Sequence, residues 1–138
     1  MAAKYVLDSC ALLAFIYKES GYDIVKTTLA QADSGSAEVY MNKVNLFEVY
    51  YDIRRSTGSQ EADDAYSMIQ KLPIVIINGI SEKVFREAAR IKTGYKISLA
   101  DSFALGEASV MSAPLITSDH HEFDAVEKNE KISFKWIR

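Results

Sequence analysis

Short apolar runs alternate with segments of helical periodicity along the chain. Pro73 and Pro114 each precede a run of apolar, mostly β-branched residues, at 74–77 and 115–117. Short apolar runs bounded by turn signals are typical of strands buried in a parallel sheet. The last segment, 131–138, instead alternates apolar and polar positions, as a half-buried edge strand does. The strands predicted in this way cover residues 4–8, 38–41, 74–77, 115–117 and 131–138.

Between these runs, apolar residues recur with the spacing of amphipathic helices. For example, Leu46, Val49, Tyr50 and Ile53 fall on one face of the segment 43–56, as expected for a helix that covers a core. Strands that alternate with helices favour an α/β fold in which a mostly parallel sheet carries helices on both faces. The predicted helices cover residues 10–18, 21–33, 43–56, 59–71, 81–93 and 98–112.

Composition narrows the class of protein. A chain of 138 residues predicts a single domain spanning 1–138. Its one cysteine, Cys10, excludes an intrachain disulfide and fits a reducing compartment. No apolar run approaches the roughly 18 residues that a membrane helix needs, so we expect a cytoplasmic protein without a membrane span. The net charge of −3 disfavours a strongly basic nucleic-acid binder but is compatible with a local basic patch.

Acidic residues follow the predicted strands at the edge where ligands bind. Asp8 ends the first strand and Asp119 follows the fourth, while Asp101 and Glu48 lie on helices that adjoin the sheet. In open α/β sheets, ligands bind outside the carboxyl ends of the strands. Several carboxylates gathered there repel one another and resist ionisation. A hard divalent cation such as Mg²⁺ or Mn²⁺ relieves this repulsion and also binds phosphate oxygens.

Each of these acids also has a simpler interpretation when it is taken alone. Asp8 suits the N-cap of the following helix, Asp101 suits a capping box, and Asp119 suits an ordinary turn. Glu48 lies opposite the apolar stripe of its helix, where a solvated face is the better interpretation. Only the joint pattern favours a metal site.

Four stretches in a fixed order resemble the motifs of PIN-domain nucleases, most closely the VapC-type toxins of bacterial and archaeal toxin–antitoxin pairs. The resemblance covers essentially the whole chain. It includes a hydroxyl residue directly after the first aspartate, Ser9, and Thr117 two residues before Asp119. The four stretches are YVLDSCALLAFIYKE (5–19), NKVNLFEVYYDIRR (42–55), ISLADSFALGEA (97–108) and PLITSDHHEF (114–123).

The resemblance implies a three-layer α/β/α fold around a parallel sheet of about five strands, and a Mg²⁺- or Mn²⁺-dependent endoribonuclease. Asp8, Glu48, Asp101 and Asp119 match the acidic quartet of the family. Asp8 and Asp101 would be the principal metal ligands. Glu48 would bind metal or orient a water molecule, and Asp119 would complete the site or hold a second ion.

The same resemblance implies the partners. Ser9 and Thr117 would position a carboxylate or a phosphate of the RNA substrate by hydrogen bonding. A homodimer is expected, inhibited by an antitoxin whose C-terminal arm fills the cleft. Basic residues that are candidates for following an RNA backbone are Lys18, Lys43, Arg54, Arg55, Lys92 and Lys96.

Other functions stay open at this point. A DNA nuclease of the same fold would use the same chemistry, because metal-activated water needs no 2′-hydroxyl group. A catalytically silent binding module would be expected to lack one of the acids. A phosphotransferase of the haloacid-dehalogenase type would need an aspartate where Cys10 stands. We expect Cys10 to be a buried packing residue, and His120 and His121 to lie outside an oxygen-rich Mg²⁺ site.

Overall fold

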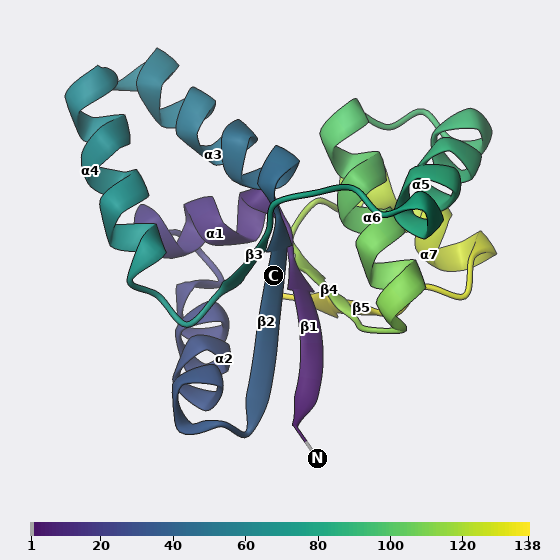
Figure 1. The fold of residues 1–138 in the computed structure, drawn as a ribbon, viewed down its shortest axis with the longest axis horizontal. Helices are drawn as coiled ribbons and strands as arrows, with labels where there is room; N and C mark the ends of the chain where they lie inside the picture. The colour runs from purple at the N-terminus through teal and green to yellow at the C-terminus, as the bar shows by residue number, and fades with distance from the viewer. Residues whose placement is uncertain (1) are drawn as a thin grey trace.

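The computed structural model describes residues 2–138 and is built on one parallel sheet of five strands (Figure 1). The strand order is β3-β2-β1-β4-β5, and every neighbouring pair is parallel. This confirms the predicted α/β fold with a parallel sheet. The strands are β1 (Ala3–Leu7), β2 (Ala37–Asn42), β3 (Val75–Ile77), β4 (Leu115–Thr117) and β5 (Phe134–Trp136).

Seven helices within the described residues cover the two faces of the sheet. Figure 1 shows the first four on one side and the last three on the other. The helices are α1 (Ser9–Ile16), α2 (Tyr22–Ser34), α3 (Lys43–Ser56), α4 (Ser59–Gln70), α5 (Glu82–Gly94), α6 (Leu99–Met111) and α7 (His120–Asn129). None of the helices within residues 2–138 is long and apolar enough to cross a membrane.

Alternating side chains of the central strands feed two separate cores. Leu7 and Ile116 pack into the core beneath α1–α4, whereas their neighbours Val6 and Leu115 pack into the core beneath α5–α7. All four side chains are fully buried. Successive strand residues point to opposite faces, so a strand covered on both sides has to be apolar throughout. This explains why β1 and β4 are apolar where they pair with each other.

The structure corrects two sequence predictions. The run at 74–77 was expected to be a buried strand, but β3 is an edge strand in which Val75 is 52% exposed. An apolar run by itself does not distinguish a central strand from an edge strand. Helix α7 was not predicted, because only Phe123 and Val126 among its ten residues are buried, which leaves little apolar periodicity to detect.

Gly21 and Gly35 offer a test of packing at the two ends of α2. Both have a left-handed backbone, with φ of 97° and 88°. A Cβ atom at Gly21 would lie 2.7 Å from the Ile137 side chain and 2.8 Å from its carbonyl oxygen, whereas one at Gly35 meets nothing within 4 Å. We expect Gly35→Ala to lower the free energy of unfolding by about 1 kcal/mol, and Gly21→Ala by a further 1–3 kcal/mol, roughly, from the clash. Urea unfolding of both variants checks this, and equal losses would contradict it.

Candidate metal centre

The four predicted carboxylates converge at the carboxyl ends of β1 and β4. Carboxylate oxygens of Asp8, Glu48 and Asp101 all lie within 4.8 Å of one another. A second group, Asp101, Asp119 and Glu122, meets the same limit. Asp101 belongs to both groups, so five acidic side chains form one continuous cluster.

These acids line a surface pocket of about 350 Å³. None of its lining residues within the described chain is a lysine, an arginine or a histidine. The five clustered acids therefore have no side-chain counterion among the lining residues, whereas a sixth lining acid, Asp52, pairs with Arg55 at the rim. The lining residues are Asp8, Ser9, Cys10, Leu13, Glu48, Asp52, Ser98, Asp101, Asp119 and Glu122.

Asp8 is the most deeply buried acid of the cluster, with 1% of its surface exposed. Its Oδ1 accepts a hydrogen bond from the Ser9 backbone N–H at 2.6 Å and lies 3.3 Å from the Ser9 hydroxyl oxygen, whose proton goes to Glu48. Its Oδ2 accepts from the Thr117 hydroxyl at 2.7 Å and the Cys10 thiol at 3.2 Å. Burial raises the pKa of Asp8, against the lowering effect of these bonds, and the charge of Glu48 raises it further. Asp8 also caps α1, so the capping interpretation and the pocket interpretation hold together.

Asp101 reaches the cluster from the first turn of α6. Ser98 caps this helix by accepting the Asp101 backbone N–H at 3.1 Å, which leaves the Asp101 carboxylate facing the pocket. Burial, followed by the charge of Asp8, raises the pKa of Asp101 from 3.8 to about 8, and the charges of Glu48 and Asp119 add to the shift. Such a pKa favours the protonated carboxyl group at neutral pH, and a bound cation would favour the ionised form.

Glu48 is not on the solvated face that its helical position suggested. Its side chain is half-buried and accepts a hydrogen bond from the hydroxyl of Ser9. Helix α3 packs against α1 and α6, so the side of the helix opposite its apolar stripe borders the pocket. Periodicity within one helix does not reveal that a second surface faces a polar cleft.

Asp119 and Glu122 enter the cluster from the start of α7. Asp119 caps this helix by accepting the Glu122 backbone N–H at 3.1 Å, and its own N–H donates to the Thr117 hydroxyl at 3.1 Å. The sequence prediction missed Glu122 because it missed α7. An acid three residues after a capping aspartate is the signal that marks this first turn.

The structure contradicts the expectation for Cys10 and agrees with the one for His120. Cys10 is not a buried packing residue, because it lines the pocket and its thiol contacts Asp8, Thr117 and Ser118. Burial raises the pKa of this thiol to about 12. His120 lies outside the pocket as expected, stacked on Trp136 with ring centroids 3.7 Å apart.

The donor set fits a hard divalent cation. It consists of carboxylate oxygens with a few hydroxyl groups, which suits Mg²⁺ or Mn²⁺ better than softer metals. Burial is the main cause of the raised pKa values of Asp8 and Asp101, and the charges of neighbouring carboxylates add to both shifts. A bound cation would favour the ionised form of both groups.

Comparison with known proteins assigns the family. The family model of the PIN domain matches residues 5–129. The chain belongs to the PIN domain family. No curated protein sequence matches it significantly.

Solved structures share the fold of this PIN domain. A chain of VapBC2 from Rickettsia felis, bound to a DNA fragment from its promoter, aligns over 96% of this chain and 97% of its own, with a TM-score of 0.73 and 16% identity. A chain of DNA-bound VapBC from Salmonella typhimurium aligns over 99% of both chains, with a TM-score of 0.72 and 15% identity. VapC20 from Mycobacterium tuberculosis, a sarcin–ricin-loop-cleaving toxin, aligns over 88% of this chain and 94% of its own, with a TM-score of 0.62 and 13% identity. These matches confirm the predicted PIN-like fold.

Two asparagines that sequence reasoning missed connect the helices carrying Glu48 and Asp101. Asn45 is fully buried one turn before Glu48, and its Nδ2 donates to the Ala100 carbonyl oxygen at 2.9 Å. Asn42 caps α3 and donates to buried Glu107 on α6 at 3.1 Å. The Oδ1 of Asn45 has no hydrogen-bond partner, alone among buried side-chain oxygen and nitrogen atoms in residues 2–138. An orphaned buried oxygen is destabilising, so this asparagine is not optimal for stability.

The raised pKa of Asp101 predicts a pH-dependent stability without metal. The folded PIN domain keeps a proton that the unfolded chain loses near pH 3.8, so this stabilisation is lost as pH rises toward about 8. Between about pH 5 and 8 we expect the free energy of unfolding to fall by up to about 1.4 kcal/mol per pH unit. Urea unfolding in EDTA measures the slope. Asp101→Asn should reduce the slope, while the raised pKa of Asp8 keeps part of it, and Mn²⁺ should stabilise most at pH 8. Equal slopes for the wild type and the variant would contradict the assignment.

The hydrogen bond from Asn45 to Ala100 predicts that one substitution changes metal affinity without lowering folding stability. Asn45→Leu removes both the orphaned oxygen and the link to Ala100, so we expect unfolding stability to stay within about 1 kcal/mol or to rise, while Mn²⁺ affinity falls about tenfold as Glu48 and Asp101 lose their register. Urea unfolding and calorimetric Mn²⁺ titration measure the two quantities. Unchanged Mn²⁺ affinity in a folded variant would show that the bond has no influence on the site.

Proposed function

We propose that this PIN domain is a Mg²⁺- or Mn²⁺-dependent endoribonuclease and the toxin of a toxin–antitoxin pair. The observation that carries the proposal is the five-acid cluster in a pocket without a side-chain counterion. Family membership supports a nuclease. The likeness in fold to VapBC toxin–antitoxin chains, and to a toxin described as cleaving the sarcin–ricin loop, supports the toxin role and RNA as the substrate.

The residues divide the catalytic tasks among them. We assign Asp8 and Asp101 as the principal cation ligands, Glu48 as the group that orients the attacking water, and Asp119 as a ligand that completes the site. A bound divalent cation lowers the pKa of a coordinated water and offsets negative charge on the phosphate. Ser9 and Thr117 hold the Asp8 carboxylate from both oxygens. In-line hydrolysis of the phosphodiester would leave 3′-hydroxyl and 5′-phosphate ends.

The proposed partners follow from the charge of the pocket and from the related complexes. An acidic pocket without its cation attracts a basic side chain, so the antitoxin is expected to place a lysine or arginine near Asp8 and Asp101. This would inhibit the nuclease by replacing the cation. We further propose a homodimer in the cytoplasm, in line with the family resemblance.

Substitution of the two principal ligands tests the catalytic assignment. We expect Asp8→Asn and Asp101→Asn each to lower Mn²⁺-dependent RNA cleavage by at least about a hundredfold, because each removes charge that holds the cation. Both variants should remain folded, since each relieves repulsion in the cluster. Cleavage of a labelled structured RNA, followed on denaturing gels with end-group analysis, measures the loss.

Asp64→Asn is the matched control, because Asp64 is exposed and contacts Gln60 outside the pocket. It should cleave like the wild type. Retained cleavage in both ligand variants would overturn the assignment. Cleavage of DNA but not RNA by the wild type would identify a DNA nuclease of this fold. Metal binding without cleavage of either would identify a catalytically silent module.

A further inference from the structure

An exposed row of aromatic rings and a guanidinium group runs along α3. Phe47, Tyr51 and Arg55 are spaced four residues apart and therefore share one side of the helix. Phe47 is 65% exposed and Tyr51 is 52% exposed. Their ring centroids are 6.2 Å apart with planes inclined by 10°, and the Arg55 guanidinium lies 5.7 Å from the Tyr51 ring centroid. We call these three residues the α3 ladder.

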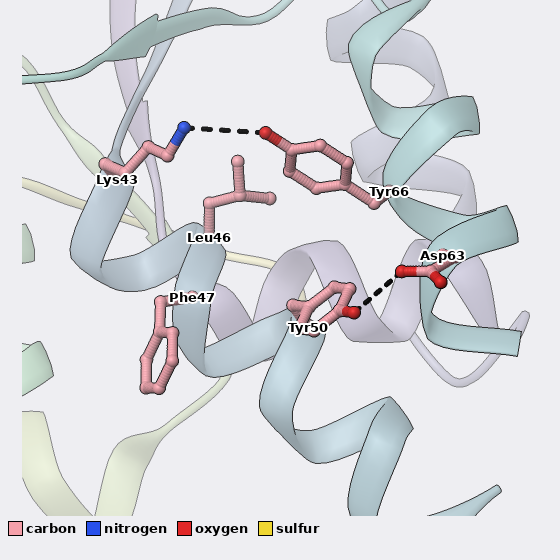
Figure 2. A pocket seen from close by; sticks show the side chains of 6 residues that line it. All are labelled: Lys43, Leu46, Phe47, Tyr50, Asp63 and Tyr66. Carbon is pink, nitrogen blue, oxygen red and sulfur yellow. Dashed lines mark hydrogen bonds between the residues drawn. The ribbon is translucent and has the colours of Figure 1, made fainter. Parts of the chain in front are cut away.

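Through Phe47 the α3 ladder borders a second pocket, which Tyr50 and Tyr66 line from the other flank of α3. There Tyr50 and Tyr66 meet edge to face with ring centroids 6.0 Å apart, and both pack against the core. Figure 2 shows the Phe47 ring directed away from Tyr50 and Tyr66. Packing within the described chain thus accounts for those two tyrosines, whereas Phe47 and Tyr51 contact each other and stay largely exposed.

The ladder lies directly beside the acidic pocket. Glu48 and Asp52 follow Phe47 and Tyr51 by one residue each, so they form the adjacent strip of the same helix, and both line the pocket. Arg55 donates to the Asp52 carboxylate at 2.8 Å, which holds the guanidinium at the rim. A polymer whose phosphate occupies the pocket therefore passes within reach of the ladder.

We propose that the α3 ladder is a stacking platform for unpaired bases of the RNA substrate next to the cleaved phosphodiester. This inference rests on the proposed nuclease function. Every base has a face that stacks on an aromatic ring, and arginine adds a cation that interacts with bases and phosphates. Arg55 already pairs with Asp52, so its charge does not choose between a nucleic acid and a protein partner. The position of the rings beside the pocket favours a single strand, because its bases reach the rings when its phosphate lies in the pocket.

The platform also provides the affinity that the acidic pocket lacks. A phosphate backbone is repelled by the carboxylates whenever the cation is absent, and the net charge of the chain is −3. Stacking is insensitive to that repulsion. The ladder therefore selects single-stranded over duplex substrate, because duplex bases are already stacked on one another.

Binding of single-stranded RNA in EDTA tests the platform without cleavage. The probe is a fluorescein-labelled oligoadenylate of about twelve nucleotides, compared with the same strand annealed to oligouridylate, with fluorescence anisotropy as the readout. We expect Phe47→Ala and Tyr51→Ala each to weaken single-strand binding by about tenfold and to leave duplex binding unchanged. Tyr51→Phe, which keeps the ring, should bind within about twofold of the wild type.

Phe85→Ala is the matched control, since Phe85 is 58% exposed on α5, which belongs to the other helical layer from α3 (Figure 1). It should bind both probes like the wild type. Wild-type single-strand affinity in both ladder variants, or equal losses for single strand and duplex, would overturn the proposal. Dissociation of a wild-type dimer by Phe47→Ala, with strand binding unchanged, would assign the ladder to a second copy of the chain. Because binding is measured without metal, a failure of the ladder is distinguishable from a failure of Mn²⁺-dependent cleavage.

Discussion

Mutual repulsion among carboxylates at one edge of the sheet is the constraint on which the rest of this structure depends. Parallel strands bring their carboxyl ends to the same edge, so Asp8 after β1 and Asp119 after β4 are brought close together. Burial then raises the pKa of Asp8 and Asp101. The surrounding hydroxyl groups and the caps of three helices hold the cluster in place despite this cost.

The cluster lies where the two helical layers meet, so its geometry depends on how they pack. Glu48 comes from the layer of α1–α4 and Asp101 from the layer of α5–α7. Side-chain bonds from Asn45 to Ala100 and from Asn42 to Glu107 cross between α3 and α6. They set the register of two helices that are far apart in the chain. Metal affinity in such a site is sensitive to these supporting bonds as well as to the ligands.

Several features near the pocket are unfavourable for folding alone. The buried acids, the orphaned Asn45 oxygen and the exposed ladder rings all lie on or beside α3 and the ends of the sheet. Elsewhere two apolar cores fill the space between the sheet and its helical layers. Local departures from those rules, concentrated at one site, are characteristic of function.

The sequence by itself determined the α/β class, the central strands and the two acids that follow them, Asp8 and Asp119, because apolar runs and acids after strands are local patterns that the parallel sheet converts into proximity. Glu48 and Asp101 lie on helices, and the resemblance to PIN-domain nucleases added them. The resemblance also singled out the hydroxyl residues Ser9 and Thr117, and both contact Asp8 in the structure. Only the tertiary structure decided that Glu48 faces a cleft, that Glu122 and Cys10 line it, and that β3 is an edge strand. These outcomes depend on which surfaces of separate elements meet, and the periodicity of one element carries no information about its neighbours.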